Sequence, residues 1–289
     1  MPACTESVPH QHHSFPGGPV TATLHEPNTP LGRFGIETLS DAGHRYVATL
    51  PAARWTNPHT GRPSLAPLAV LVDYVGGMVN HHRRAPDEWT VSSELALELV
   101  PGAADLVAAA PGSKIVASAR PVGPKGRTCL GTCELTLEQQ TIAVGSVRSV
   151  HISIPATVAT QSHSYPPADP LRSGELAELM CVRVGDAGPD DALLWQAPSP
   201  VLDNSMGVVH GGVAAAGCEL VAAAALDGAG TEPETALLTV SYLRPFRSAA
   251  TSHYRARVSG AGGRRGVAEV EAIGGDGRTA LQARVTAYR

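Results

Sequence analysis

Apolar and polar residues follow two different patterns along the chain, and together they predict two long helices and two sets of strands. Nearly continuous apolar runs at about 64–82 and 210–226 indicate helices that are buried on all sides. Shorter runs of alternating apolar and polar residues indicate strands with one buried and one exposed face. They cover 92–100, 114–121, 127–137 and 141–154 after the first helix, and 236–244, 252–259, 267–273 and 279–288 after the second. Each helix is therefore expected to be wrapped by an antiparallel sheet of four or five strands.

The two halves of the chain repeat each other with a shift of about 145 residues. Asp41-Ala42-Gly43 recurs as Asp186-Ala187-Gly188, Gly61 recurs as Gly207, and Glu219 takes the place of Asp73. Glycine-rich stretches at 123–126 and 260–263 predict a hairpin at the same place in each set of strands. A period of this length indicates two copies of one structural unit.

The repeat divides the chain into four segments. An N-terminal arm, 1–34, is rich in proline and histidine and is expected to be loosely held. The first unit covers 35–154, a proline-containing linker covers 155–173, and the second unit covers 174–289. The predicted fold class is α+β, with two tandem repeats that each wrap a long central helix in an antiparallel sheet. His10, His12 and His13 of the arm either bind a metal or belong to a solvated tail, and no fixed geometry favours the metal.

Composition excludes several classes of protein. With 43% hydrophobic residues a packed core is expected, and a net charge of −4 gives no basic excess to attract nucleic acid. The apolar run 213–226 is interrupted by Glu219 and is shorter than the roughly 20 residues that cross a bilayer, so no membrane span is predicted. The N-terminal sequence lacks the basic start and apolar middle of a secretory signal. We therefore expect a cytoplasmic protein in a reducing compartment.

The cysteines give no sign of a disulfide framework or a metal site. There are five, an odd number, scattered along the chain. Cys129 and Cys133 would point to the same face of one strand, but no second pair of ligands accompanies them. We interpret them as buried free thiols.

The segment from Asn204 to Glu219 carries the clearest chemical pattern. It contains His210-Gly211-Gly212 at the predicted start of the second helix. Glycines there leave backbone N–H groups without partners or side-chain cover, so a carbonyl oxygen can approach and be polarised by the helix N-terminus. Glu219 lies about 13 Å farther along the same helix, too far to act on that carbonyl. If the two helices pack antiparallel, Asp73 of the first helix is brought to these glycines instead.

This pattern resembles the signature of the hotdog-fold acyl-CoA thioesterases of the phenylacetate-pathway type. The resemblance is carried by Asn204, Gly207, 210–212 and the acid at Glu219, together with the strand motif 91–101 that recurs at 235–245. It implies a double hotdog over about 35–289 and hydrolysis of acyl-CoA or a related acyl thioester. Because a carboxylate and backbone donors suffice for this reaction, and no group of residues has ligand spacing, no metal or other cofactor is expected.

The resemblance also implies a role for each residue of the site. Asp73 corresponds to the family's acid, acting as general base or nucleophile, and Ser92 to the hydroxyl that helps hold the attacking water. Asn204, His210, Gly211 and Gly212 correspond to the partners that oppose the acid from the second half.

The matching second site would use Glu219 and Thr235 against the first half. There the pattern fails, because Ser64-Leu65-Ala66 stands where His-Gly-Gly is expected and only Asn57 and Gly61 remain of the preceding turn. We therefore expect one complete site and one damaged site in each chain.

Several alternatives stay open at this stage. Asp73 could be a structurally paired buried carboxylate, and His210-Gly211-Gly212 only a tight helix entry. The basic residues at 81–84 either complement the helix C-terminus or clamp the phosphates of coenzyme A. A non-catalytic acyl-CoA-binding hotdog protein is the alternative function. The sequence does not determine the acyl chain or distinguish coenzyme A from a carrier protein, and association of double-hotdog chains into a homo-oligomer is an expectation from the family alone.

Overall fold

The computed structural model describes residues 22–41, 44–155, 158, 175–188, 191–228 and 234–289. Within these residues the strands form one antiparallel 13-stranded sheet, in the order β1-β2-β3-β5-β6-β7-β4-β10-β13-β12-β11-β9-β8. The first half of the chain supplies β1 (Thr23–Leu24), β2 (Glu37–Asp41), β3 (Tyr46–Pro51), β4 (Glu88–Leu99), β5 (Lys114–Val122), β6 (Thr128–Leu137) and β7 (Gln140–Ser153). The second half supplies β8 (Val182–Gly185), β9 (Asp191–Gln196), β10 (Glu234–Tyr242), β11 (His253–Gly262), β12 (Arg265–Ile273) and β13 (Thr279–Tyr288).

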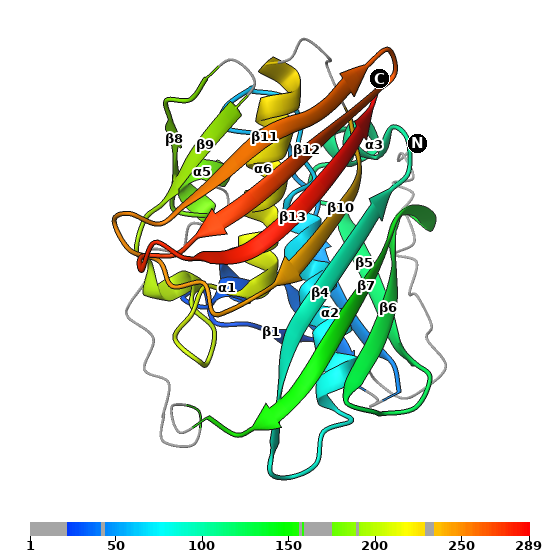
Figure 1. Ribbon diagram of the computed structural model, residues 1–289. Coiled ribbons are helices and arrows are strands. Elements are labelled where there is room, and N and C mark those ends of the chain that lie inside the picture. The colour runs from blue at the N-terminus through cyan, green and yellow to red at the C-terminus, as the bar shows by residue number, and fades with distance from the viewer. Residues whose placement is uncertain (1–21, 42–43, 156–157, 159–174, 189–190, 229–233) are drawn as a thin grey trace, which may run out of the picture.

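Two long helices, α2 (Pro67–His81) and α6 (Gly211–Gly228), lie side by side against the same face of this curved sheet (Figure 1). Helix α2 packs on the strands of the first half and α6 on those of the second, and the core between them is mostly alanine, valine and leucine. The shorter elements are α1 (Pro30–Arg33), α3 (Ala103–Ala109), α5 (Leu176–Leu179) and a 3₁₀ turn, η1 (Pro200–Leu202). Both helices are buried nearly all round, as their apolar sequences predict.

The two long helices run antiparallel. Ser64, just before α2, contacts Glu219 in the middle of α6, and Gly212, at the start of α6, contacts Asp73 in the middle of α2. Strands β4 and β10 pair at the centre of the sheet, where Ala96 lies opposite Thr239. These two residues lie 143 residues apart, close to the shift between the two halves of the sequence.

Some elements differ from those that the sequence predicts. The eight predicted strands and both long helices are present, with ends displaced by up to four residues. The sequence does not predict strands β1, β2, β3, β8 and β9, and these five extend the two outer regions of the sheet beyond four or five strands per half. In β3 nearly every residue is buried, which removes the alternation that indicates a strand. In β9 the partly exposed positions hold Leu193 and Trp195, which hides the alternation in the same way.

The described end of the predicted N-terminal arm is part of the fold. Strand β1 pairs with β2, and the buried guanidinium of Arg33 in α1 donates hydrogen bonds to the carbonyl oxygens of Glu178 and Leu179, each at 2.6 Å. These contacts join the first half to the second. The histidines at 10, 12 and 13, and nearly all of the predicted linker, lie outside the described residues.

Helix α6 is long and apolar enough, by length and composition, to cross a membrane. In this protein 72% of it is buried by the sheet and by α2. Burial in the protein core therefore accounts for its apolar sequence.

Candidate active site

Asp73 joins three elements from both halves of the chain. Its carboxylate is 8% exposed. The Oδ1 atom accepts a hydrogen bond from the Ser92 hydroxyl of β4 at 2.7 Å, and Oδ2 accepts one from the Gly212 N–H of α6 at 2.8 Å. The antiparallel packing of α2 and α6 thus brings the acid of one half to the His-Gly-Gly segment of the other.

The two glycines at the start of α6 have different roles. A β-carbon on residue 212 would lie 2.5 Å from Val70 Cα and 2.7 Å from the Ala69 carbonyl oxygen, so Gly212 allows the two helices to approach closely. A β-carbon on residue 211 would lie 2.8 Å from Asp73 Oδ2, so Gly211 leaves the space beside the carboxylate open. The Gly212 N–H is engaged by Asp73, whereas the Gly211 N–H has no acceptor within the described part of the chain. Of the two donors that the sequence predicts for a carbonyl, only Gly211 therefore remains available.

His210 lies at the edge of this carboxylate. Its Nδ1 atom is 3.5 Å from Asp73 Oδ2 and accepts a 3.2 Å hydrogen bond from the Gly212 N–H. Burial lowers the pKa of His210, and the charge of Asp73 opposes that shift only in part. The imidazole is therefore neutral at pH 7, and His210 helps to orient the start of α6.

Asn204 shapes the turn that leads into α6. Its N–H donates to the Val208 carbonyl, its own carbonyl accepts from the Gly207 N–H, and its side-chain oxygen accepts from the Met206 N–H. Gly207 has a φ of +66°, which favours glycine. The side-chain oxygen of Asn204 is thus engaged within the turn.

The first half contains a similar turn that is one residue longer. Asn57 accepts a hydrogen bond from the Gly61 N–H, and Gly61 has a φ of +68°. The amide nitrogen of Asn57 donates to the Leu220 carbonyl at 2.8 Å, so this side chain holds α6 beside Glu219. The two turns therefore have equivalent backbone hydrogen bonds.

The residues predicted for the second site also come together, with a different arrangement. Glu219 is 4% exposed, and its carboxylate accepts hydrogen bonds from the hydroxyls of Thr235 at 2.7 Å and Ser64 at 3.1 Å. The Ala66 N–H donates to the Ser64 hydroxyl at 3.2 Å, so that hydroxyl stands between the helix N-terminus and the carboxylate. Burial raises the pKa of Glu219, and the two hydroxyls oppose the shift. A cavity of about 40 Å³ adjoins these residues, with Leu65 and Leu99 in its wall.

Tyr242 is a residue of the site that the sequence did not indicate. It lies at the end of β10, and its hydroxyl donates a 3.1 Å hydrogen bond to the Gly211 carbonyl oxygen. Burial, with a smaller contribution from the charge of Asp73, raises the pKa of this hydroxyl. Aligning the two halves of the sequence would have singled out Tyr242, because its equivalent in β4 is Leu99, which has no hydroxyl.

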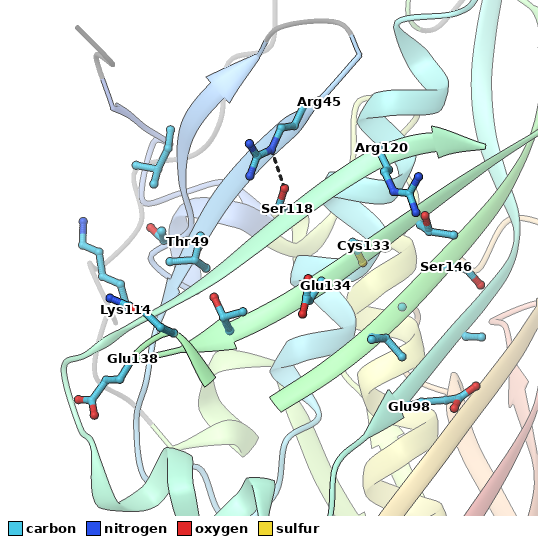
Figure 2. A pocket seen from close by; sticks show the side chains of 18 of the residues that line it. Arg45, Thr49, Glu98, Lys114, Ser118, Arg120, Cys133, Glu134, Glu138 and Ser146 are labelled. Carbon is cyan, nitrogen blue, oxygen red and sulfur yellow. Dashed lines mark hydrogen bonds between the residues drawn. The ribbon is translucent and has the colours of Figure 1, made fainter. Parts of the chain in front are cut away.

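A much larger hollow, of about 1500 Å³, lies on the sheet of the first half (Figure 2). Its wall holds both cations and anions, including Arg45, Lys114 and Glu134, and Arg45 is hydrogen-bonded to Ser118 at 2.9 Å. Asp73 and Ser92 are not part of this wall. The mixture of charges favours a solvated surface. The groups suited to catalysis lie instead around Asp73.

Comparison with known protein families gives a match in the part of the chain that contains the start of α6. Residues 206–281 match the thioesterase superfamily, and this stretch contains Gly211, Gly212 and Glu219. No curated protein matches the sequence.

Among solved structures, the chain is similar to the acyl-CoA thioesterase II TesB2 of Mycobacterium marinum, with a TM-score of 0.56 and 13% identity over 90% of this chain and 98% of that one. It is also similar to the tesB protein of Mycobacterium avium subspecies paratuberculosis, with a TM-score of 0.54 and 11% identity over 87% and 96%. A hot dog fold protein of Alicyclobacillus acidocaldarius matches with a TM-score of 0.50 and 15% identity over 86% and 95%. The resemblance to hotdog-fold thioesterases that the sequence predicts is confirmed.

Proposed function

We propose that this protein, a thioesterase by the match of its second half and by its fold, hydrolyses acyl-CoA or a related acyl thioester at the Asp73 site. One observation carries the proposal. The buried carboxylate of Asp73, held by Ser92 and by the Gly212 N–H, lies beside the unengaged N–H of Gly211. A base and a carbonyl-polarising donor, supplied by opposite halves, are the two groups that thioester hydrolysis requires.

The proposed reaction follows from this geometry. The thioester carbonyl oxygen binds at the Gly211 N–H, where the N-terminus of α6 stabilises the negative charge that develops on it. Asp73 removes a proton from a water molecule that Ser92 helps to hold, and the water oxygen attacks the carbonyl carbon. The C–S bond then breaks, the thiol leaves with a proton, and the carboxylic acid is released. Direct attack by Asp73, through an anhydride that water hydrolyses, is the other path available to the same residue.

We also propose that the architecture is a double hotdog, with 35–154 and 174–289 as the two domains, 1–34 as an arm and 155–173 as the linker. Three observations support it: the equivalent turns at Asn57 and Asn204, the antiparallel helices α2 and α6, and the central pairing of β4 with β10. A cytoplasmic location is part of the proposal. The described cysteines, 129, 133, 181 and 218, are free thiols, which suits a reducing compartment.

A panel of acyl-CoA substrates of increasing chain length, assayed for release of free thiol, tests this function. We expect turnover of at least one member by the wild-type protein, and its loss in Asp73→Asn. Binding measured by calorimetry without thiol release from any member would contradict hydrolysis, and would support the non-catalytic acyl-CoA-binding alternative. Acyl carrier protein thioesters in the same assay distinguish the two kinds of thiol.

A further inference from the structure

The peptide group between Gly211 and Gly212 is hydrogen-bonded at both of its ends. The Tyr242 hydroxyl donates to its carbonyl oxygen at 3.1 Å, and its N–H donates to Asp73 Oδ2 at 2.8 Å. A hydroxyl, a peptide and a carboxylate therefore form one chain of hydrogen bonds. In such a chain each bond polarises the next, and the peptide donates more strongly to the carboxylate than it would alone.

We propose that Tyr242 is a positioning residue for Asp73 and acts through the Gly211–Gly212 peptide. The inference rests on the proposed function of Asp73 and adds a residue that the hydrolytic scheme does not contain. Tyr242 holds the plane of the peptide, and the peptide holds one oxygen of the carboxylate, while Ser92 holds the other. Both oxygens of the acid are thereby fixed beside the Gly211 N–H.

The local backbone explains why such a restraint matters. Two consecutive glycines have more conformational freedom than any other pair, and the first turn of a helix lacks the hydrogen bonds that fix later N–H groups. The Tyr242 ring also borders the space beside Gly211, because a β-carbon there would lie 3.4 Å from Tyr242 Cε1. Tyr242 thus restricts the backbone conformation of the two glycines, which have no side chains to do so, and leaves room for a substrate carbonyl.

The Glu219 site provides an internal comparison. Leu99 occupies in β4 the position that Tyr242 occupies in β10, and it has no hydroxyl to donate. There the Ala66 N–H donates to the Ser64 hydroxyl and not to Glu219. The tyrosine and the peptide-to-carboxylate bond are therefore present together at the Asp73 site and absent together at the Glu219 site.

The charged and titratable groups that face Tyr242 leave its hydroxyl as a donor. Burial raises the pKa of this hydroxyl, and the negative charge of Asp73 on α2 adds to the shift. The buried thiol of Cys218 on α6 and the hydroxyl of Tyr254 on β11 also face it, and both are neutral because burial raises their pKa. His210 at the start of α6 is neutral because burial lowers its pKa. The hydroxyl therefore stays protonated throughout the pH range in which the folded protein is assayed.

Tyr242→Phe removes the hydroxyl and keeps the ring, and Tyr254→Phe is its matched control. Tyr254 is also buried against α6, but its hydroxyl donates to the Gln196 side chain at 3.0 Å, away from Asp73. A net hydrogen bond of about 1 kcal/mol corresponds to a rate change of roughly fivefold to tenfold. We expect Tyr242→Phe to lower kcat by about that factor with KM unchanged, and Tyr254→Phe to leave kcat unchanged.

A second measurement separates this role from general destabilisation. In ¹H–¹⁵N spectra of the full chain, the Gly212 amide proton should move upfield in Tyr242→Phe, because its bond to Asp73 weakens, and should stay in place in Tyr254→Phe. In an Asp73→Asn background, Tyr242→Phe should move it much less, since the two residues act through one chain. An unchanged Gly212 amide in Tyr242→Phe overturns the inference, whatever happens to kcat.

The outcomes distinguish the inference from the function on which it rests. If Asp73→Asn keeps full turnover, the proposed active site is wrong. If Asp73→Asn is inactive while Tyr242→Phe keeps both its kcat and its Gly212 amide position, only the role of Tyr242 is wrong.

Discussion

At the scale of single residues, the two buried acids Asp73 and Glu219 differ in one partner. Each accepts a hydrogen bond from a hydroxyl of the adjacent central strand, Ser92 or Thr235. Asp73 takes its other bond from a helix N-terminal N–H, whereas Glu219 takes it from Ser64. A glycine lies beside the first acid and Leu65 at the equivalent position near the second. We infer that these two differences favour Asp73 over Glu219 as the working acid.

This difference predicts unequal effects of neutralising the two acids. Asp73→Asn should lower kcat by about 10²-fold or more while substrate binding stays measurable, because the carboxylate acts mainly on the transition state. Glu219→Gln should change kcat less than about threefold, a bound that is far below the effect of losing one preorganised catalytic group. Steady-state kinetics on the best substrate of the panel measures both. An inactive Glu219→Gln beside an active Asp73→Asn would reverse the assignment.

The two glycines of α6 predict a second contrast. Gly211→Ala places a methyl group against the Asp73 carboxylate, so kcat should fall by about 10²-fold with little loss of stability. Gly212→Ala forces a methyl group into the backbone of α2 at Val70, and should lower the free energy of unfolding by about 1–3 kcal/mol. Urea unfolding and kcat, measured on both variants, test this division. Equal losses of stability would show that both glycines serve packing alone.

The raised pKa of Glu219 predicts that the stability of the folded protein depends on pH. The folded protein binds this proton more tightly than the unfolded chain, in which the ordinary value is 4.5. The stability gained in this way is present below about pH 4.5 and is lost as the pH rises through the folded pKa. Glu219→Gln stays neutral, so its stability relative to the wild type should increase between pH 4.5 and 8 in urea unfolding. The exposed Glu98→Gln is the control for the substitution itself, and a stability difference for Glu219→Gln that does not change with pH would contradict the shift.

At the scale of elements, the position of α2 against the sheet fixes where Asp73 points. The helix crosses β7 at Gly76, where a β-carbon would lie 2.7 Å from Val147 Cγ2. One residue later, at Gly77, the nearest atom to such a carbon is Ser92 Oγ at 3.9 Å, an ordinary contact. Substituting Gly76 therefore tests close packing against β7, whereas substituting Gly77 tests helix propensity alone.

Gly76→Ala should destabilise the protein by about 1–3 kcal/mol, because the collision with β7 exceeds the gain in helix propensity. Gly77→Ala should stabilise it by about 0.5–1 kcal/mol, since a helix interior favours alanine and the site has room. Thermal or urea unfolding of the two variants gives the comparison directly. Stabilisation by both substitutions would mean that α2 does not press on β7.

At the scale of the whole molecule, neither half holds a complete site. Asp73 and Ser92 belong to the first half, and the N-terminus of α6 and Tyr242 belong to the second. The central β4–β10 pairing, the contact of α2 with α6, and the Arg33 hydrogen bonds to Glu178 and Leu179 hold the halves together. Of these, the Arg33 contact is the one that a single substitution can remove.

Arg33→Met should lower the free energy of unfolding by about 2–4 kcal/mol, because two carbonyl oxygens lose the charged donor of a buried side chain. Arg257→Met, at a side chain that is 78% exposed, is the control and should change stability by less than about 0.5 kcal/mol. Urea unfolding measures both. Equal stability of the two variants would show that the Arg33 contacts do not contribute to joining the halves.

Sequence reasoning could predict the long helices and most of the strands, because these depend on local patterns. Apolar runs and alternation located both long helices and eight of the strands, and glycine turns at equivalent places gave the period. The local motif around His210 and its partner acid at Asp73 also followed from sequence, once the period related the two helices. Strands β3 and β9 could not be predicted in this way. In β3 burial on both faces removes the alternation, and in β9 apolar residues at the partly exposed positions do so.

Which groups meet depends on how the elements pack against each other. Gly211 and Gly212 look equivalent in sequence, yet the crossing of the helices engages the N–H of Gly212 with Asp73 and leaves that of Gly211 open. Tyr242 is more than 150 residues from Asp73 in sequence, and nothing local ties its hydroxyl to the Gly211 carbonyl. A hydrogen bond depends on distances of a few tenths of an ångström, and these are set by how close α2, α6 and the central strands pack and not by any periodicity along the chain.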